Sequence, residues 1–252
     1  MALGEEGVTG RGVRSSRRLL TWVRGHNYDV GVRYWPVARA IRLADPERRW
    51  QVLDVGSGSS GIVPHLPGWR VTRTDLQREA HNGLPFVRAS VLELPFRDRS
   101  WDVVVCVDVL EHLPESIREG AMRELVRVSR KLLVVAFPWG PTARMADLRF
   151  ANAAVACGQT PPEWVRQHLM HVYPEPELLD RLLPKLAAGR PYREQRFFNE
   201  SLALQRSHRF LALRFTSGYL AWSLLCGLGL PILARPVHSS RGYRCISVVQ
   251  FG

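Results

Sequence analysis

The sequence predicts an α/β fold built on a doubly wound, mostly parallel sheet. Two observations lead to it. Short apolar runs alternate with helical segments from about residue 51 to Phe137, and the run 103–107, "VVVCV", contains no polar residue. A strand of that kind is covered on both faces, as in parallel sheets. With 252 residues, 46% of them hydrophobic, the chain can bury a large core. We expect one domain over 19–252 behind a disordered lead-in at 1–18.

The individual elements follow from local patterns along the chain. Strands are predicted at 51–55, 69–75, 86–90, 103–107, 131–137, 192–198 and 243–251. Helices are predicted at 20–49 (in two pieces), 114–129, 175–188 and, as a hairpin, 200–234. Ser116 and Glu119 stand at the spacing of a capping box for the helix at 114–129. Residues 139–173, with "PWGP" and "TPPEW", predict an irregular insertion.

Charge and cysteine content narrow the class of protein. The chain carries 35 basic and 23 acidic residues, a formal net charge of +12, and nearly all of the basic residues are arginines. Such a balance favours anionic partners, but the arginines are scattered and form no long block, so nucleic acid is not expected. Four widely separated cysteines, Cys106, Cys157, Cys226 and Cys245, give no zinc-site spacing, so no metal site is expected. A reducing, cytoplasmic location fits, because the N-terminus lacks the apolar centre of a signal peptide.

One segment bears on membrane contact. Residues 216–234 contain no charged side chain and approach the roughly 20 residues that a spanning helix needs. Gly227, Gly229 and Pro231 interrupt the second half of the segment. We therefore expect a helix that docks on protein, and peripheral contact with a membrane surface stays open as the alternative.

The stretch 52–61, "VLDVGSGSSG", satisfies the spacing G-x-G-x-x-G directly after a strand, and Asp75 follows about 20 residues after the end of that strand. By itself this is a dinucleotide fingerprint. However, Asp54 adds a negative charge before the glycines, and Pro64 and Pro67 shorten the helix that would hold a pyrophosphate. A ligand with an ammonium and a sulfonium group fits better, with an NAD-dependent reductase as a distant alternative.

Residues 51–138 resemble a class I S-adenosylmethionine-dependent methyltransferase of the type 11 branch, which has a Rossmann-like fold. Four motifs in order carry the resemblance: "VLDVGSGSSG", "VTRTDL", the "LPF" segment and "VDVLEHL". The resemblance implies S-adenosyl-L-methionine as the cofactor. It also implies that the insertions 139–173 and 200–234 cover the mouth of an acceptor pocket.

The same resemblance implies roles for single residues. Those expected to bind the cofactor are Asp54, Gly56, Ser57, Gly58, Asp75, Leu76, Ser90 and Asp108. Asp54 and the glycine loop would hold the methionine end, Asp75 the ribose and Leu76 the adenine. Ser90 stands where many relatives carry an aspartate, and its hydroxyl can still accept a hydrogen bond from the adenine amine. Asp108 and His112 are the catalytic candidates beside the methyl group, although packing and capping of its own turn is the simpler interpretation of His112.

Two further histidines, His168 and His171, stand at i and i+3 in "RQHLMHVYP". Without an evident third ligand, pocket lining or packing is favoured over a metal site. The chain has no (D/N)PP(Y/F) string after the fourth strand and no catalytic Pro-Cys, so a small-molecule, lipid-like or amphiphilic acceptor is expected. A non-catalytic or membrane-peripheral protein that binds an anionic lipid or nucleic acid stays open as the alternative.

Overall fold

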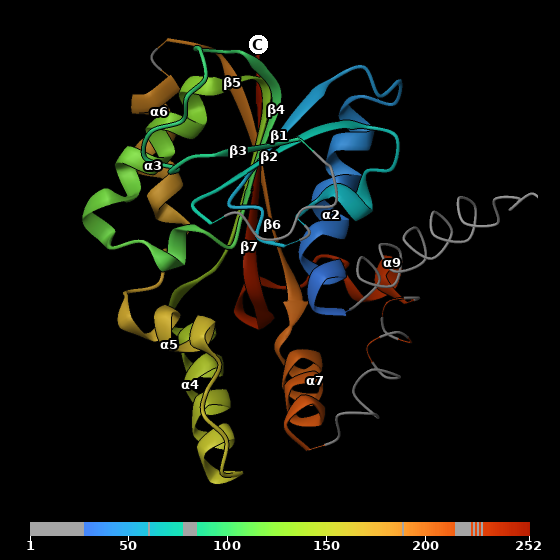
Figure 1. Cartoon of the computed structure of the whole chain (residues 1–252), viewed down its shortest axis with the longest axis vertical. Helices are drawn as coiled ribbons and strands as arrows, with labels where there is room; N and C mark the ends of the chain where they lie inside the picture. Colours follow the sequence, from blue (N-terminus) through green and yellow to red (C-terminus); the bar gives the residue numbers. More distant parts are fainter. Residues whose placement is uncertain are drawn as a thin grey trace, which may run out of the picture.

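The computed structural model describes residues 28–59, 61–77, 85–187, 189–214, 223, 225, 227 and 229–252. Within this part of the chain, seven strands form one sheet in the order β3-β2-β1-β4-β5-β7-β6. Helices lie on both faces of the sheet (Figure 1). The predicted α/β architecture is therefore confirmed.

All seven predicted strands are present, with small shifts at their ends. They are β1 Gln51–Val55, β2 Arg70–Asp75, β3 Phe86–Arg88, β4 Trp101–Val107, β5 Ser129–Pro138, β6 Tyr192–Ser201 and β7 Gly242–Phe251. The first five pair in parallel, and β7 lies antiparallel between β5 and β6. The described helices are α2 Tyr28–Ala44, α3 Glu115–Val128, α4 Gly140–Ala156, α5 Glu163–Met170, α6 Glu177–Ala187, α7 Leu202–Arg214 and α9 Leu230–Leu233.

Strand β4 shows why its sequence has no polar residue between 103 and 107. Successive side chains of a strand point to opposite faces. Val103 and Val105 pack in the core that α2 covers, whereas Val104 and Cys106 pack in the core that α3 and α6 cover (Figure 1). All four are fully buried. The sheet is thus a middle layer with an apolar core on each side.

The strand order fixes where a ligand can bind. From β1 the chain moves to β2 and β3 on one side, then returns to β4 on the other side of β1. In open α/β sheets, ligands bind outside the carboxyl ends of the strands at such a switch point. Here these ends lead into the glycine loop 56–61 after β1 and into Asp108 after β4. Helices α4, α5 and α7 lie beyond this edge of the sheet (Figure 1).

Two local predictions are wrong. Residues 139–173 are mostly helical, because the prolines that suggested an irregular chain stand at helix starts: Pro141 lies in the first turn of α4, and Pro162 is the N-cap of α5. The capping box of α3 does not form, because Pro114 occupies the N-cap and Ser116 lies inside the helix. Glu119 instead contacts Arg123 and Lys185.

Three predicted segments lie wholly or largely outside the described residues. They are the lead-in 1–18, the first piece of the predicted helix 20–49, which precedes Tyr28, and most of the uncharged segment 216–234. Among the helices that the structure describes, none has the length and hydrophobicity that crossing a membrane requires.

Candidate active site

The glycine loop after β1 folds tightly against its neighbours. Gly56 has φ +70° and donates its amide to the Thr74 carbonyl over 2.8 Å. A Cβ at Gly56 would lie 2.3 Å from Val109 Cγ2, and one at Gly61 would lie 2.0 Å from Asp54 Oδ2. Only glycine tolerates both this backbone conformation and this closeness. The loop is therefore pressed between the ends of β1 and β4.

Asp54 is a fully buried acid beneath this loop. Its Oδ2 accepts a hydrogen bond from the Ile62 amide over 2.8 Å. Within the described residues, Oδ1 of Asp54 and the buried Oγ of Ser57 have no hydrogen-bond partner. Burial raises the pKa of Asp54 to about 7. A buried oxygen without a partner is costly, so the site favours a cationic or hydrogen-bond-donating ligand.

The other predicted cofactor residues lie along the same edge. Asp75 ends β2, and its Oδ2 accepts a hydrogen bond from the Gly58 amide over 2.9 Å, so this acid also shapes the glycine loop. Leu76 beside it is 61% exposed. The Ser90 hydroxyl accepts the Leu92 amide over 3.2 Å within its own turn. Their contacts with a cofactor stay predictions, although β1 and β2 bring Asp54, Gly58 and Asp75 together as expected.

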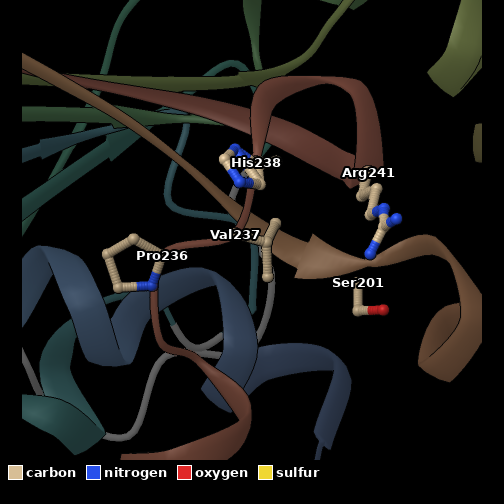
Figure 2. A pocket seen from close by; sticks show the side chains of 5 residues that line it. All are labelled: Ser201, Pro236, Val237, His238 and Arg241. Atoms are coloured by element: carbon tan, nitrogen blue, oxygen red, sulfur yellow. The ribbon is translucent and has the colours of Figure 1, made fainter.

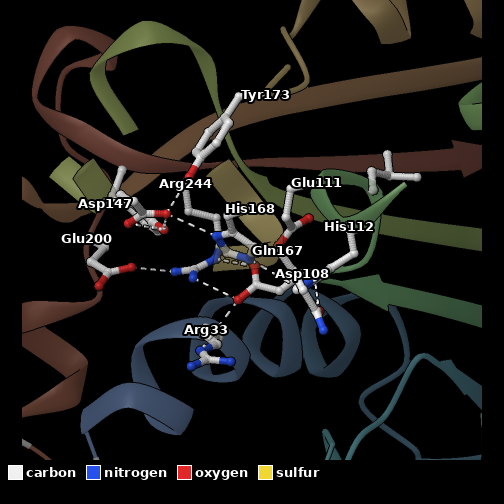
Figure 3. Close-up of polar contacts among 12 residues, drawn as sticks. Arg33, Asp108, Glu111, His112, Asp147, Gln167, His168, Tyr173, Glu200 and Arg244 are labelled. Atoms are coloured by element: carbon white, nitrogen blue, oxygen red, sulfur yellow. Dashed lines mark hydrogen bonds and ion pairs between the residues drawn. The ribbon is translucent and has the colours of Figure 1, made fainter. Parts of the chain in front are cut away.

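A pocket of about 360 Å³ opens at the carboxyl end of β4. Five distant segments contribute charged or polar side chains to it: Arg33 of α2, Asp108 and His112 after β4, His168 of α5, Glu200 of β6 and Arg244 of β7 (Figure 3). Another hollow lies on the surface beside β6, lined by Ser201, Pro236, Val237, His238 and Arg241 (Figure 2). None of its lining residues is fully buried, whereas the first pocket contains buried charges.

Arg244 forms the centre of the ion pairs in this pocket. Its Nε and one terminal nitrogen donate to the two Asp108 oxygens over 2.8 and 2.9 Å, and the other terminal nitrogen donates to Glu200 over 2.5 Å. Arg33 approaches Asp108 to 3.4 Å. Burial alone would raise the pKa of Asp108, but Arg244 and Arg33 hold it below its usual value. Asp108 is therefore an ionised anchor and a poor proton acceptor.

Both carboxylates that bind Arg244 have an uncommon backbone conformation. Asp108 has φ +54° and Glu200 has φ +63°, in the left-handed region that favours glycine. Non-glycine residues in such conformations are enriched at functional sites, where the surrounding structure holds them. The bidentate pair with Arg244 holds the turn after β4 in this conformation.

A second buried acid, Asp147 of α4, collects four donors. It accepts His168 Nδ1 over 3.0 Å, the hydroxyls of Tyr173 and Tyr243 over 2.5 and 2.9 Å, and Arg209 over 2.7 Å. Burial would raise the pKa of Asp147, but the contacts with His168 and Arg209 keep it below its usual value. Asp147 therefore stays ionised and fixes the His168 ring.

His168 pairs with His112, not with His171. The Nε2 atoms of His112 and His168 lie 3.2 Å apart, and His112 Nδ1 lies 3.1 Å from Gln167 Oε1. Burial, with His168 as a further cause, lowers the pKa of His112 to about 4, so this ring is neutral at pH 7. His171 follows the end of α5 and only caps it through its backbone.

Sequence reasoning missed most of this network: Arg33, Glu111, Asp147, Tyr173, Glu200, Arg209, Tyr243 and Arg244. One signal was present for Arg244, because a lone arginine in the apolar strand "YRCISVVQF" needs a buried partner. Asp102 accepts the Gln51 amide and pairs with Arg130 at the opposite end of β4, so it has a structural role away from the pocket.

Comparison with known proteins agrees with this geometry. A type 11 family model described as a methyltransferase domain matches residues 53–134, which contain the glycine loop, Asp75 and the turn 108–112. We call this matched segment, about a third of the chain, the methyltransferase core. This core supplies Asp108 and His112 to the pocket, and the other lining residues come from segments outside the match.

Three known proteins are similar to this chain. A candidate methyltransferase of Encephalitozoon cuniculi is 36% identical over 129 residues, which is 48% of this chain and 60% of that protein. Demethylmenaquinone methyltransferase of Porphyromonas gingivalis is 30% identical over 129 residues, 40% of this chain and 51% of that protein. The chain thus spans only 60% and 51% of these curated relatives. The solved magnesium protoporphyrin IX methyltransferase of Synechocystis PCC 6803 with bound SAH matches 100% of this chain and 90% of its own, with TM-score 0.50 and 14% identity. That likeness concerns the fold alone.

Proposed function

We propose that this chain transfers a methyl group from S-adenosylmethionine to a small-molecule or lipid-like acceptor. The observation that carries the proposal is the buried, unpartnered Oδ1 of Asp54 under a tight glycine loop, inside the methyltransferase core and beside a charged pocket. Such a position suits a ligand that carries positive charge and donates hydrogen bonds.

The residues present fit this cofactor. Asp54 and Ser57 offer unpartnered oxygens to the methionine end, and Asp75 and the exposed Leu76 stand ready for the ribose and adenine. When bound, S-adenosylmethionine supplies an activated methyl group on a sulfonium. The protein's own task is to align the acceptor and exclude water, which is catalysis by proximity and orientation.

The pocket residues indicate what the acceptor looks like. Arg33 is the most exposed of the arginines that pair with Asp108, with 38% of its side chain accessible. Phe150 and Trp164 add aromatic walls. An acceptor with a flat or apolar body and a polar or anionic group near Arg33 fits best. His112 has a pKa of about 4 and faces His168, so we do not assign it the role of a general base at neutral pH.

We predict that Asp75→Asn weakens S-adenosylmethionine binding about 10- to 150-fold. A hydrogen bond to a charged group contributes about 1.5–3 kcal/mol, and this change removes the charge while keeping the shape. Titration calorimetry measures the effect. The matched control is Asp98→Asn, because Asp98 is exposed and its ion pair in the described part of the chain is with Arg127, away from the site. Absence of binding by the unsubstituted protein would contradict the proposed function, and protection from thermal unfolding by NAD instead would favour a reductase.

The affinity for S-adenosylmethionine should rise with pH up to about 7 and then level off. Burial raises the pKa of Asp54 from 3.8 to about 7, so below pH 7 a proton must leave before the carboxylate can pair with a cation. The expected slope approaches about tenfold per pH unit below this value. Asp54 has the opposite effect on the ligand-free protein, whose stability falls as pH rises from 3.8 to about 7, because the folded state holds this proton more tightly. Calorimetry at several pH values measures this slope. The part of the slope that comes from the Asp54 proton should disappear in Asp54→Asn.

The acceptor itself can be found by transfer of label. Incubation of the protein and labelled S-adenosylmethionine with a cell extract, followed by identification of the labelled product, identifies the methylated compound. An Arg33→Gln variant should label it more slowly, with a higher KM for the acceptor and unchanged affinity for the cofactor. Label that appears only in nucleic acid would contradict the proposed acceptor class.

A further inference from the structure

Three side chains at the pocket floor point metal-binding atoms toward one another. Glu111, His112 and His168 each offer one ligand atom, and these atoms lie within 4.8 Å of one another. Glu111 is fully buried, and neither carboxylate oxygen has a hydrogen-bond partner among the described residues. Its Oε1 lies 3.6 Å from His168 Nε2. A buried carboxyl group without a hydrogen bond is costly unless something pairs with it.

The hydrogen bonds around the two rings determine which nitrogens carry protons. His168 Nδ1 faces the ionised Asp147, so it donates a proton there. His112 Nδ1 faces Gln167 Oε1, and the Gln167 orientation is set because its nitrogen donates to Glu163 over 3.1 Å. Both Nδ1 atoms are therefore donors. An uncharged ring that donates from Nδ1 carries its lone pair on Nε2.

These two lone pairs face each other across 3.2 Å, with the Glu111 carboxyl group beside them (Figure 3). Two acceptors at this distance repel unless a positive charge lies between them. That charge is either a proton on one ring or a metal ion bound to both. The space between the two Nε2 atoms is thus a cation position, and an experiment must distinguish a proton from a metal ion there.

We propose that Glu111, His112 and His168 bind a divalent transition-metal ion such as Zn²⁺. Two nitrogens at about 2.0–2.1 Å from a tetrahedral zinc ion lie about 3.3 Å apart, close to the distance found here. The other ring nitrogen of a metal-binding histidine commonly donates a hydrogen bond to a carboxylate or carbonyl oxygen. Here Nδ1 of His168 faces Asp147, and Nδ1 of His112 faces the Gln167 side-chain oxygen. Imidazole and carboxylate ligands suit Zn²⁺, Fe²⁺ and Mn²⁺.

The bound ion would face the acceptor pocket. His112 and His168 line that pocket, and Glu111 lies behind them. Three protein ligands leave a coordination position open, which is typical of catalytic and not of structural zinc sites. An acceptor hydroxyl bound there would lose its proton more readily. This last role rests on the proposed methyl transfer, whereas binding of the ion does not.

The test is metal uptake by the whole chain without cofactor. Protein freed of metal with a chelator is dialysed against Zn²⁺ or Co²⁺, and bound metal per chain is measured by elemental analysis. The Co²⁺ form is also examined for the visible absorption bands of a four-coordinate ion. All proteins carry Cys157→Ser, because the exposed Cys157 thiol could bind metal by itself. We expect one additional ion per chain compared with His112→Gln and with Glu111→Gln.

His171→Gln is the matched control, since His171 follows the same helix and lies outside the cluster. It should bind as much metal as the unsubstituted protein, and metal should raise the thermal unfolding temperature of both. Either of two results overturns the proposal: no ion bound by the folded, unsubstituted protein, which leaves a proton between the rings, or binding that survives both ligand substitutions. If the ion binds but no methyl group is transferred, the proposed function fails and the metal site stands.

Discussion

Replacing Arg244 by methionine is expected to lower the free energy of unfolding by about 3–5 kcal/mol. The side chain is 4% exposed, and its partners Asp108 and Glu200 are 13% and 6% exposed. Methionine fills much of the space but removes the ion pair of the buried Glu200 and leaves Asp108 with only the longer contact to Arg33, at 3.4 Å. Urea unfolding followed by circular dichroism measures the change. The acceptor pocket should be lost with it, because Arg244 holds the turn after β4.

Arg196→Met is the matched control for this prediction. Arg196 also binds two carboxylates, Asp180 and Glu194, but Asp180 is 57% exposed and the arginine itself 20%. Ion pairs open to water contribute about 0–1 kcal/mol, so the control should change stability little. Equal losses of unfolding free energy in the two variants would show that burial does not make the Arg244 ion pairs more stabilising than the exposed ones.

Replacing Asp54 by alanine is expected to weaken S-adenosylmethionine binding at least about 30-fold. Removing one partner of a buried, hydrogen-bonded charge pair costs about 2–5 kcal/mol. The substitution also frees the Ile62 amide that Asp54 accepts, so the glycine loop loses one of its anchors. Calorimetric titration of the folded variant measures the loss of affinity.

Asp45→Ala separates this effect from general damage. Asp45 is also buried and accepts a backbone amide, that of Trp50 over 2.8 Å, but it lies after α2 and before β1, away from the carboxyl edge. Its loss should lower stability while the affinity for the cofactor stays unchanged. Unaltered affinity in Asp54→Ala would remove Asp54 from the cofactor site.

The features that sequence predicted well are local ones. The apolar run of β4, the glycine loop with Asp54, and Asp75 at the end of β2 each depend on residues adjacent in the chain. Prolines caused the main error, because the same residue that interrupts a helix also starts one, as Pro141 does for α4. Local patterns therefore predicted the strands and the residues at the carboxyl edge of β1 and β2. They did not predict that the insertion 139–173 is mostly helical.

The acceptor side of the pocket depends on contacts that local patterns do not contain. Arg244 and Asp108 are 136 positions apart, and His112 and His168 are 56 apart. Arg244 reaches Asp108 because β7 runs antiparallel to β5, in a register that sets Arg244 opposite Pro138. Strand order and register are tertiary properties, so the partner of each buried charge could not be derived from its own segment.

The position of β7 has a consequence for how the molecule folds. In the described sheet, β6 pairs only with β7, so β6 and the helix α7 that follows it cannot join the sheet until β7 has entered beside β5. Contacts between such distant segments form late, since closing a long loop costs entropy before any contact compensates for it. Arg244 and Tyr243 belong to β7, so they reach the pocket only when β7 pairs with β5. A folding intermediate that already binds cofactor through β1 and β2 would thus have no acceptor pocket, and methyl transfer would begin only with the last step of folding.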